Sequence, residues 1–366
     1  MSPNYSTSTI TQTPVIDIPK LRTILKDVYD IVDCEIFSLT GYDDLNFRIE
    51  QVKFASRVHP DLAKRKEDIF IVKFTNPVEN ANPYLLDAQT QLSKRLREAG
   101  IPTAEALPTV GGNLWQHVYM NDQVKLPVRL FNFLPGVMLE KIGYSNSVYF
   151  LLGALLAEFH NVTENFEHKA YEDHYSFLSM ENWDQLEVEF EFQLKHGLIK
   201  DKKRIELIQK GLRDFRKDIL VQKDKFKQGL IHSDFNETNV LLQVASDGKC
   251  TITGLLDFGS SHRSLLIYDI AALVLYTTID AKVDDWQSVA KSVIEGYSTK
   301  REPADLDYIL VSMRARLTSS FLCSVRTTRI NYRNEDPSYI LKMHKNGWKV
   351  LERLTQDYDN DTARNG

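Results

Sequence analysis

Cysteine is scarce in this 366-residue sequence, which contains three: Cys34, Cys250 and Cys323. They lie far apart and none belongs to a CxxC pair, so the sequence predicts neither a disulfide framework nor a zinc site. An odd number of scattered cysteines is typical of a protein in the reducing cytosol. We therefore expect three free thiols in a cytoplasmic protein.

A long hydrophobic run is also missing. The most apolar stretch, residues 265–279, includes Asp269 and is shorter than the ~20 residues that a bilayer-spanning helix needs. The N-terminus has no basic residue before Lys20 and no apolar segment of the length found in signal peptides. We expect no membrane association, and a disordered Ser/Thr-rich tail over residues 1–19.

The sequence has no excess of positive charge. Its formal net charge is −5, whereas a dedicated nucleic-acid-binding protein usually carries a basic excess. The hydrophobic share of 43% and the charged share of 26% are ordinary for a globular protein. The length is sufficient for two lobes with a substantial core. We expect no nucleic-acid partner, and the sequence does not encode the oligomeric state.

Residues 20–131 show the pattern of a small lobe that is rich in strands. Asn82 is suited to cap a helix, Pro83 suits its first turn and Gly100 ends it. The run IFIVKFT is strongly β-prone, with one lysine in its middle. The expected elements are a helix at 20–31, two strands flanking Gly41, a loop at 58–68, a strand at 69–75, a helix at 82–100 and strands at 114–120 and 126–134.

The pattern changes at NFLPG, residues 132–136, where Pro135 and Gly136 predict a hinge. Beyond it the chain is mostly helical, with helices expected at 148–162 and 200–222 from their 3.6-residue apolar period. The fold class that we predict is α+β and bilobal. A β-rich N-lobe spans residues 20–131, and a larger, mostly helical C-lobe spans residues 137–366.

Polar residues gather at the ends of two strands in the C-lobe. The segments IHSDFNETNVLL (231–242) and TITGLLDFGSS (251–261) are joined through Ser246-Asp247-Gly248, a natural hairpin turn. We expect the hairpin to bring Asp234, Asn239 and Asp257 together. Their side chains offer the oxygen ligands that Mg²⁺ prefers when it is bound with nucleotide phosphates. Taken singly, Asp234 is also explained as a turn residue and Asn239 as a satisfied edge amide.

The pattern D-x-x-x-x-N followed by D-F-G resembles the catalytic loop and metal-binding segment of kinases. The resemblance implies that Asp234 deprotonates the acceptor hydroxyl and that Asn239 and Asp257 hold metal. A lysine inside a buried strand is costly unless it meets anions, so Lys73 suits the donor phosphates. The alternative for Lys73 is an edge-strand residue that faces water. We expect Asp87 to pair with Lys73, and Gln89 is the competing partner. The alternative for Asp87 is a solvent-exposed charge on the helix surface.

Three features of protein kinases are absent. The first strand turn reads LTGYDDLNF and contains no G-x-G-x-x-G. Only nine residues separate Gly259 from Asp269, too few for an activation segment, and no A-P-E follows. Ser233 stands where a protein kinase has arginine. We therefore expect a small-molecule acceptor.

The motifs IHSDFNETNVLL and GLLDFGSS, together with the helix LGALLAEFH that contains His160, resemble the aminoglycoside phosphotransferase and choline kinase superfamily. Within it, GYDDLNFRI, NPYLLDAQ, IPTA, LPVRLFNFLPG and ENWDQL are similar to hydroxylysine kinases. The resemblance covers residues 20–355 and implies phosphorylation of the side-chain hydroxyl of 5-hydroxy-L-lysine, with GTP or ATP as donor and Mg²⁺ as cofactor. It also implies lysine degradation in the cytoplasm. The family usually has glutamate where Asp87 stands.

The resemblance also implies further contacts with donor and acceptor. Donor contacts fall on the nucleotide loop and the hinge: Tyr42, Asn46, Asn132, Phe133 and Leu134. An acceptor with two ammonium groups and a carboxylate calls for acids and a base. Candidates for these acceptor contacts are Asp43, Asp44, Asp184, the ring of Trp183, and Arg314 or Arg316. The alternative for Trp183 is a core tryptophan at a helix start.

Other readings of the sequence stay open. The acceptor is choline, ethanolamine, homoserine or an aminoglycoside if the chain belongs to another branch of the superfamily, and each of these acceptors bears an amine. A different class is a nucleotide-binding pseudokinase that acts as an interaction module. Such proteins commonly lose one of the catalytic residues, whereas Lys73, Asp234, Asn239 and Asp257 are all present. Nucleotide turnover separates the two classes.

Overall fold

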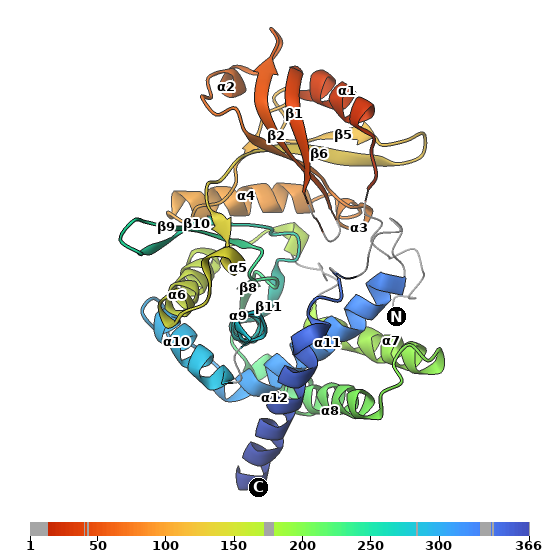
Figure 1. The fold of residues 1–366 in the computed structure, drawn as a ribbon, viewed down its shortest axis with the longest axis vertical. Helices are drawn as coiled ribbons and strands as arrows, with labels where there is room; N and C mark the ends of the chain where they lie inside the picture. The colour runs from red at the N-terminus through yellow and green to blue at the C-terminus, as the bar shows by residue number, and fades with distance from the viewer. Residues whose placement is uncertain are drawn as a thin grey trace. The chain divides into compact units, whose positions relative to one another are not determined.

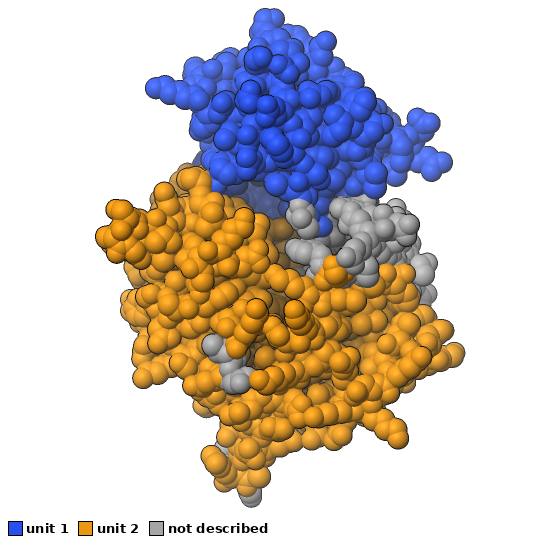
Figure 2. Space-filling model, viewed as in Figure 1, with its two compact units in different colours: residues 1–94, 103–134, 331–335 blue, residues 95–102, 135–330, 336–366 orange. Residues whose placement is uncertain are grey.

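The computed structural model describes residues 14–39, 41, 44–171, 179–282, 285–329, 338 and 340–365. The chain divides into two compact units, shown in different colours in Figure 2. Unit 1 comprises residues 1–94, 103–134 and 331–335, and unit 2 comprises residues 95–102, 135–330 and 336–366. None of the helices within the described ranges is long and apolar enough to cross a membrane.

Unit 1 is built on an antiparallel sheet, of which Figure 1 labels β1, β2, β5 and β6. The strand order is β1-β2-β3-β6-β4, and β5 also pairs with β6. Alternation of apolar and polar residues explains the strands, because one face is buried. In β3, Phe70, Val72 and Phe74 are fully buried while Ile71 and Lys73 are half-buried. The strands are β1 (Ile31–Leu39), β2 (Leu45–Phe54), β3 (Phe70–Phe74), β4 (Ala106–Leu107), β5 (Gln116–Tyr119) and β6 (Lys125–Asn132).

Helix α1 (Ile18–Tyr29) covers the buried face of this sheet, and its apolar stripe joins the core of unit 1. Asp17 caps the helix by accepting a hydrogen bond from Lys20 N at 2.7 Å, and Asp30 ends it in the left-handed conformation. The other helices of this region are α2 (Pro60–Ala63), α3 (Pro77–Asn80) and α4 (Leu85–Glu98), whose last residues belong to unit 2.

Two local expectations needed correction in this region. Residues 58–68 were expected to form a loop, but they include α2, whose first turn is favoured by Pro60 and capped by the ring of His59. The helix expected to begin at Pro83 begins at Leu85 instead. The Asn82 side chain accepts a hydrogen bond from Tyr84 N at 3.1 Å and forms a turn before the helix.

Unit 2 is mostly helical, as Figure 1 shows for the green-to-blue part of the chain. Helix α9 (Leu266–Ala281) is buried on almost every side and packs against α6 (Asn146–Thr163), α10 (Trp286–Ser298) and α11 (Ile309–Arg329). The remaining α-helices described in this unit are α5 (Leu139–Ile142), α7 (Trp183–Lys195), α8 (Lys202–Asp218) and α12 (His344–Asn365). A β-rich N-terminal unit and a helical C-terminal unit confirm the predicted α+β, bilobal fold class.

Helices α6 and α10 approach each other closely at two glycines. A Cβ atom at Gly153 would collide with the Val293 carbonyl oxygen, and one at Gly296 would collide with the Phe150 carbonyl oxygen. Only glycine permits backbones to come this close. Beyond the crossing, His160 of α6 and Tyr297 of α10 meet through a hydrogen bond of 2.8 Å.

Small sheets in unit 2 carry the polar segments. Strand β8 (Gln228–Ile231) pairs with β11 (His262–Leu265), and β9 (Val240–Val244) pairs with β10 (Cys250–Leu255) and β7 (Val137–Met138). The turn between β9 and β10 is the predicted hairpin. Gly248 N donates to Ala245 O at 2.9 Å, and Gly248 has a φ of 82°.

Candidate active site

The hairpin places Asn239 and Asp257 at one end of two paired strands. Asn239 directly precedes β9, and Asp257 follows β10 by two residues. Leu256 N donates to Asn239 O at 2.8 Å, which extends the pairing to the polar residues. Asp234 lies in the loop between β8 and β9. The predicted convergence of these residues thus has a direct structural basis in unit 2.

Asp234 is held by the asparagines of its own loop. Asn239 Nδ2 donates to the main-chain oxygen of Asp234 and to its Oδ2, both at 2.9 Å. Asn236 Nδ2 donates to Asp234 Oδ1, also at 2.9 Å. The Asn239 amide nitrogen is therefore committed to Asp234, and in the described part of the chain no group donates to Asn239 Oδ1. That oxygen and the Asp257 carboxylate form a donor set that fits Mg²⁺.

The groups around Asp234 shift its pKa in opposite directions. Burial raises the pKa of Asp234 above its ordinary value, and the carboxylates of Asp257 and Glu237 act in the same direction. The Arg316 guanidinium and His232 act to lower that pKa. Arg316 Nη2 lies 3.7 Å from Asp234 Oδ1 and donates to Ser233 O at 2.9 Å. A carboxylate with a raised pKa is a stronger base than an exposed aspartate.

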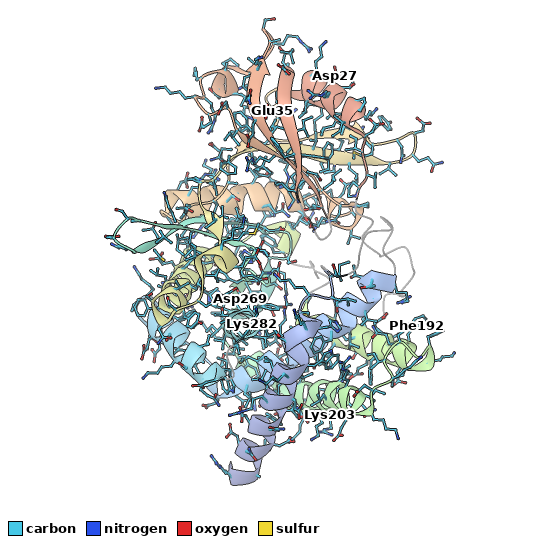
Figure 3. All side chains as sticks on the ribbon, viewed as in Figure 1. Asp27, Glu35, Phe192, Lys203, Asp269 and Lys282 are labelled. Carbon is cyan, nitrogen blue, oxygen red and sulfur yellow. The ribbon has the colours of Figure 1, made fainter. Side chains whose placement is uncertain are left out.

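Asp269 of α9 fixes the backbone just before Asp234. It is fully buried, and its carboxylate accepts hydrogen bonds from His232 N at 2.7 Å and Ser233 N at 2.8 Å. His160 Nε2 lies 3.1 Å from the same carboxylate. Burial alone would raise the pKa of Asp269, but the hydrogen bonds and charge of its partners hold that pKa below its usual range. Figure 3 labels Asp269 in unit 2.

This arrangement supports an unusual backbone conformation. Ser233 has a φ of 67° and Asp257 has a φ of 59°, both in the left-handed region that residues with a side chain seldom adopt. Such strain persists only where the surroundings impose it, and it gathers at functional sites. At Ser233, Asp269 binds the amide nitrogen and Arg316 binds the carbonyl oxygen. Sequence reasoning assigned no role to Asp269 beyond interrupting an apolar run.

Lys73 occupies a central strand of unit 1, between Asn46 of β2 and Arg129 of β6 in the register of the sheet. Its side chain is 15% exposed, so the edge-strand alternative does not apply. Lys73 Nζ lies 2.6 Å from Asp44 Oδ2. Asp44 is itself buried, and its Oδ1 accepts hydrogen bonds from Asn76 N at 2.7 Å and from Asn76 Nδ2 at 2.8 Å.

The two helix residues considered as partners of Lys73 have contacts of their own. Asp87 Oδ2 accepts a hydrogen bond from Gln91 Nε2 at 2.7 Å, and pairing of Asp87 with Lys73 stays a prediction. Gln89 is buried; its Oε1 accepts from Arg129 Nη1 at 2.7 Å and its Nε2 donates to Glu79 Oε2 at 3.1 Å. Sequence reasoning missed Arg129 and Glu79. The alternation of β6, which directs Arg129 to the same sheet region as Lys73, was the available signal.

The remaining donor residues are placed as follows. Tyr42 and Asp43 lie outside the described residues. Asn132 ends β6, and its Oδ1 accepts a hydrogen bond from Glu105 N at 2.7 Å. Phe133 and Leu134 follow and are half-buried, and the Arg48 guanidinium lies 5.7 Å from the centre of the Phe133 ring. Contact of these hinge residues with a nucleotide base stays a prediction.

The acceptor candidates separate into core, surface and site residues. Trp183 is 1% exposed, its Nε1 donates to Leu212 O at 3.0 Å, and its ring packs against Phe215, so it is a core tryptophan. Asp184 is exposed and pairs with Arg216. The guanidinium of Arg314 is buried against Asp214 at 2.9 Å. Of the two arginines considered, only Arg316 contacts the loop that carries Asp234.

The chain is similar to known proteins over nearly its whole length. Hydroxylysine kinase from Mus musculus is 21% identical over 357 residues, which cover 93% of this chain and 90% of the relative. Hydroxylysine kinase from Danio rerio is 24% identical over 356 residues, which cover 95% of this chain and 94% of the relative. The structure of amicoumacin kinase hAmiN in complex with AMP-PNP, Ca²⁺ and Ami has a TM-score of 0.63 at 13% identity, over 92% of this chain and 94% of that one.

These similarities confirm the predicted class of enzyme, a phosphotransferase with an alcohol group as acceptor, and the predicted resemblance to hydroxylysine kinases. The sequence model of the phosphotransferase enzyme family matches residues 52–306. That range is more than half of the chain and includes Lys73, the catalytic loop around Asp234, and Asp257. The chain therefore belongs to the phosphotransferase enzyme family.

Proposed function

We propose that this protein is a hydroxylysine kinase. It transfers the γ-phosphate of GTP or ATP to the side-chain hydroxyl of 5-hydroxy-L-lysine and acts in lysine degradation in the cytoplasm. The observation that supports phosphoryl transfer is the placement of Asp234, held by Asn239, beside the strand ends that carry Asn239 and Asp257. The choice of acceptor is supported by relatives that match nearly their whole length.

In this reaction the acceptor hydroxyl oxygen forms a bond to the γ-phosphorus, and the bond from that phosphorus to the bridging β-phosphate oxygen breaks. Asp234 accepts the hydroxyl proton, and the nucleoside diphosphate leaves. Asn236 and Asn239 orient the Asp234 carboxylate, so that its lone pairs point in fixed directions before the acceptor binds. The raised pKa of Asp234 makes it a more effective proton acceptor.

Two kinds of positive charge serve the donor phosphates. Asn239 and Asp257 would hold Mg²⁺, which neutralises phosphate charge when bound. Lys73 of unit 1 contributes an ammonium group, and its position in a central strand fixes the point from which its side chain extends. We assign the nucleotide to residues 20–131 and the hinge 132–136, with Tyr42, Asn46, Asp87, Asn132, Phe133 and Leu134 as further donor contacts. Residues 137–366 carry the base and the acceptor site, with Asp184 as a candidate acid for the substrate. Asp43, in residues 20–131, is a further candidate acid.

A phosphoryl-transfer assay tests the proposal. Purified protein with Mg²⁺ is offered GTP and ATP in parallel against hydroxylysine, lysine, choline and ethanolamine, and the phosphorylated product is identified by mass spectrometry. Lysine is the decisive control because it lacks only the hydroxyl. Turnover with hydroxylysine and none with lysine supports the acceptor, and the ratio of GTP to ATP turnover gives the donor preference.

The Asp234→Asn protein serves as the matched preparation that reveals contaminating kinase activity. Turnover with choline or ethanolamine instead of hydroxylysine would mean that the proposed acceptor is wrong and that the proposed reaction type is right. Nucleotide binding without turnover of any acceptor would contradict the proposed substrate. It would favour an interaction module.

A further inference from the structure

We propose that Asp44 is the positioning residue of the phosphate-binding lysine, and that it links Lys73 to helix α4 through Asn76 and Glu79. This inference rests on the proposed function, because it assigns a role in binding the phosphoryl donor. It places one acidic partner of Lys73, Asp44, in the segment before β2.

The first step is the pair itself. Lys73 Nζ and Asp44 Oδ2 lie 2.6 Å apart, and the two side chains are 15% and 7% exposed. A pair this deeply buried has lost most of its hydration, so each charge depends on the other. An ammonium group carries three protons, and the Asp44 carboxylate contacts it from one direction. Asp44 therefore helps to set the position of the Lys73 ammonium group.

The second step is that Asp44 is fixed independently of Lys73. Its Oδ1 accepts hydrogen bonds from the backbone nitrogen of Asn76 at 2.7 Å and from Asn76 Nδ2 at 2.8 Å. With Oδ1 occupied in this way, Oδ2 is the atom that faces Lys73. Gly41 lies close to Asp44, since a Cβ at Gly41 would collide with the Asp44 carbonyl oxygen. The carboxylate is thus held in place before any ligand arrives.

The third step is a continuous chain of hydrogen bonds to the helix. Asn76 Nδ2 also donates to Glu79 Oε1 at 3.0 Å, and Glu79 Oε2 accepts from Gln89 Nε2 of α4 at 3.1 Å. Gln89 in turn accepts from Arg129 Nη1 at 2.7 Å. Asn76 binds both neighbours through Nδ2, whereas Glu79 and Gln89 each use two different atoms, so the orientation of one residue constrains the next. Helix α4 thereby constrains Asp44 through Gln89.

Steady-state kinetics of Asp44→Asn tests this role. The amide that replaces Oδ2 would point an N–H group at the ammonium, so donor binding and turnover both suffer. We expect a fall in kcat of about 10-fold or more and a rise in the KM for nucleotide of several-fold, while the KM for the acceptor stays the same. The control is Asp33→Asn, which removes the carboxylate of an exposed pair with Lys53 in the same sheet and should leave all three parameters unchanged.

A second variant covers the case in which Asp44→Asn does not fold. Asn76→Ala leaves both charges in place and removes the side-chain anchor of Asp44, so the KM for nucleotide should still rise, by a smaller factor. Circular dichroism and thermal melting establish that each variant is folded. Nucleotide affinity is also measured directly with a fluorescent GTP or ATP analogue.

Two outcomes would overturn the inference. A higher KM for the acceptor, with the KM for nucleotide and the nucleotide affinity unchanged, would show that Asp44 binds the acceptor. Donor parameters equal to those of Asp33→Asn would show that Asp44 has no role in catalysis. If the unaltered protein binds nucleotide but phosphorylates no acceptor, the proposed function fails, and the affinity of the variants for nucleotide still decides the inference.

Discussion

Replacing Asp269 by asparagine tests how the catalytic loop is held. The carboxylate is fully buried and accepts three hydrogen bonds, from His232 N, Ser233 N and His160 Nε2. Asparagine has nearly the same shape but one acceptor oxygen, so in either orientation its amide nitrogen faces a backbone N–H. If the amide nitrogen replaces Oδ1, Ser233 N loses its partner; if it replaces Oδ2, both His232 N and His160 Nε2 do.

The cost follows from these contacts. A buried donor without a partner costs about 1–3 kcal/mol, and hydrogen bonds to a charged group contribute about 1.5–3 kcal/mol each, more than those to a neutral amide. The better orientation loses one such bond and weakens two, so the loop is destabilised by roughly 2–4 kcal/mol. Because the pKa of Asp269 is depressed, this stabilisation is present at neutral pH in the unaltered protein and is lost as the pH falls below 3.8 towards the folded-state pKa.

Hydrogen exchange and urea unfolding measure this effect. We expect the amides of His232 and Ser233 to exchange roughly 30- to 1,000-fold faster in Asp269→Asn, and turnover to fall as Asp234 loses its fixed position. The matched control is Asp224→Asn, which removes the same charge from an exposed position. Equal amide protection and equal urea midpoints in the two variants would refute the reasoning.

Three further predictions concern unit 2. Asp234→Asn should keep nucleotide binding and the circular dichroism spectrum but lower turnover by ~10²-fold or more; unchanged turnover would rule it out as the base. Arg316→Met removes the donor to Ser233 O and the charge near Asp234, so turnover should fall about 10-fold or more, with partial recovery in Arg316→Lys. Burial and the Glu237 carboxylate raise the pKa of Asp280 to about 8. The folded protein therefore holds a proton that the unfolded chain releases, and stability falls by up to ~1.4 kcal/mol per pH unit between pH ~4 and ~8. Asp280→Asn should flatten this dependence of the melting temperature; an unchanged slope would contradict the assignment.

Features that depend on nearby residues could be predicted from the sequence. The hairpin follows from Ser246-Asp247-Gly248 between two apolar runs, and it alone brings Asn239 next to Asp257. The burial of β3 follows from its alternation, which also marked Lys73 as unusual. In these cases the local pattern and the tertiary structure impose the same conformation.

The contacts that could not be predicted from the sequence join side chains to partners that are distant in sequence. Asp269 reaches the Ser233 amide from 36 residues away, and Arg316 reaches the Ser233 carbonyl from 83 residues away. Asp269 lies on a strongly apolar helix and Arg316 on a helix of mixed composition, and neither composition indicates a partner. Asp44 can be recognised in the sequence as a charged residue. Its pairing with Lys73, however, depends on a hydrogen bond from Asn76, which lies 32 residues further along the chain. Such contacts are set by how helices and strands pack, which the spacing of residues does not encode.

The close crossing of α6 and α10 has a consequence for the effects of mutation. Gly153 and Gly296 lie on the helices that carry His160 and Tyr297, and Gly296 immediately precedes Tyr297. Any side chain at either glycine pushes the helices apart, lengthens the bond between His160 and Tyr297, and loosens the support of Asp269. In a library of variants screened for activity, these two glycines would be as intolerant as the residues that handle the substrate. A map of mutational sensitivity would therefore extend the apparent active site deep into the helical core, along positions that have no side chain.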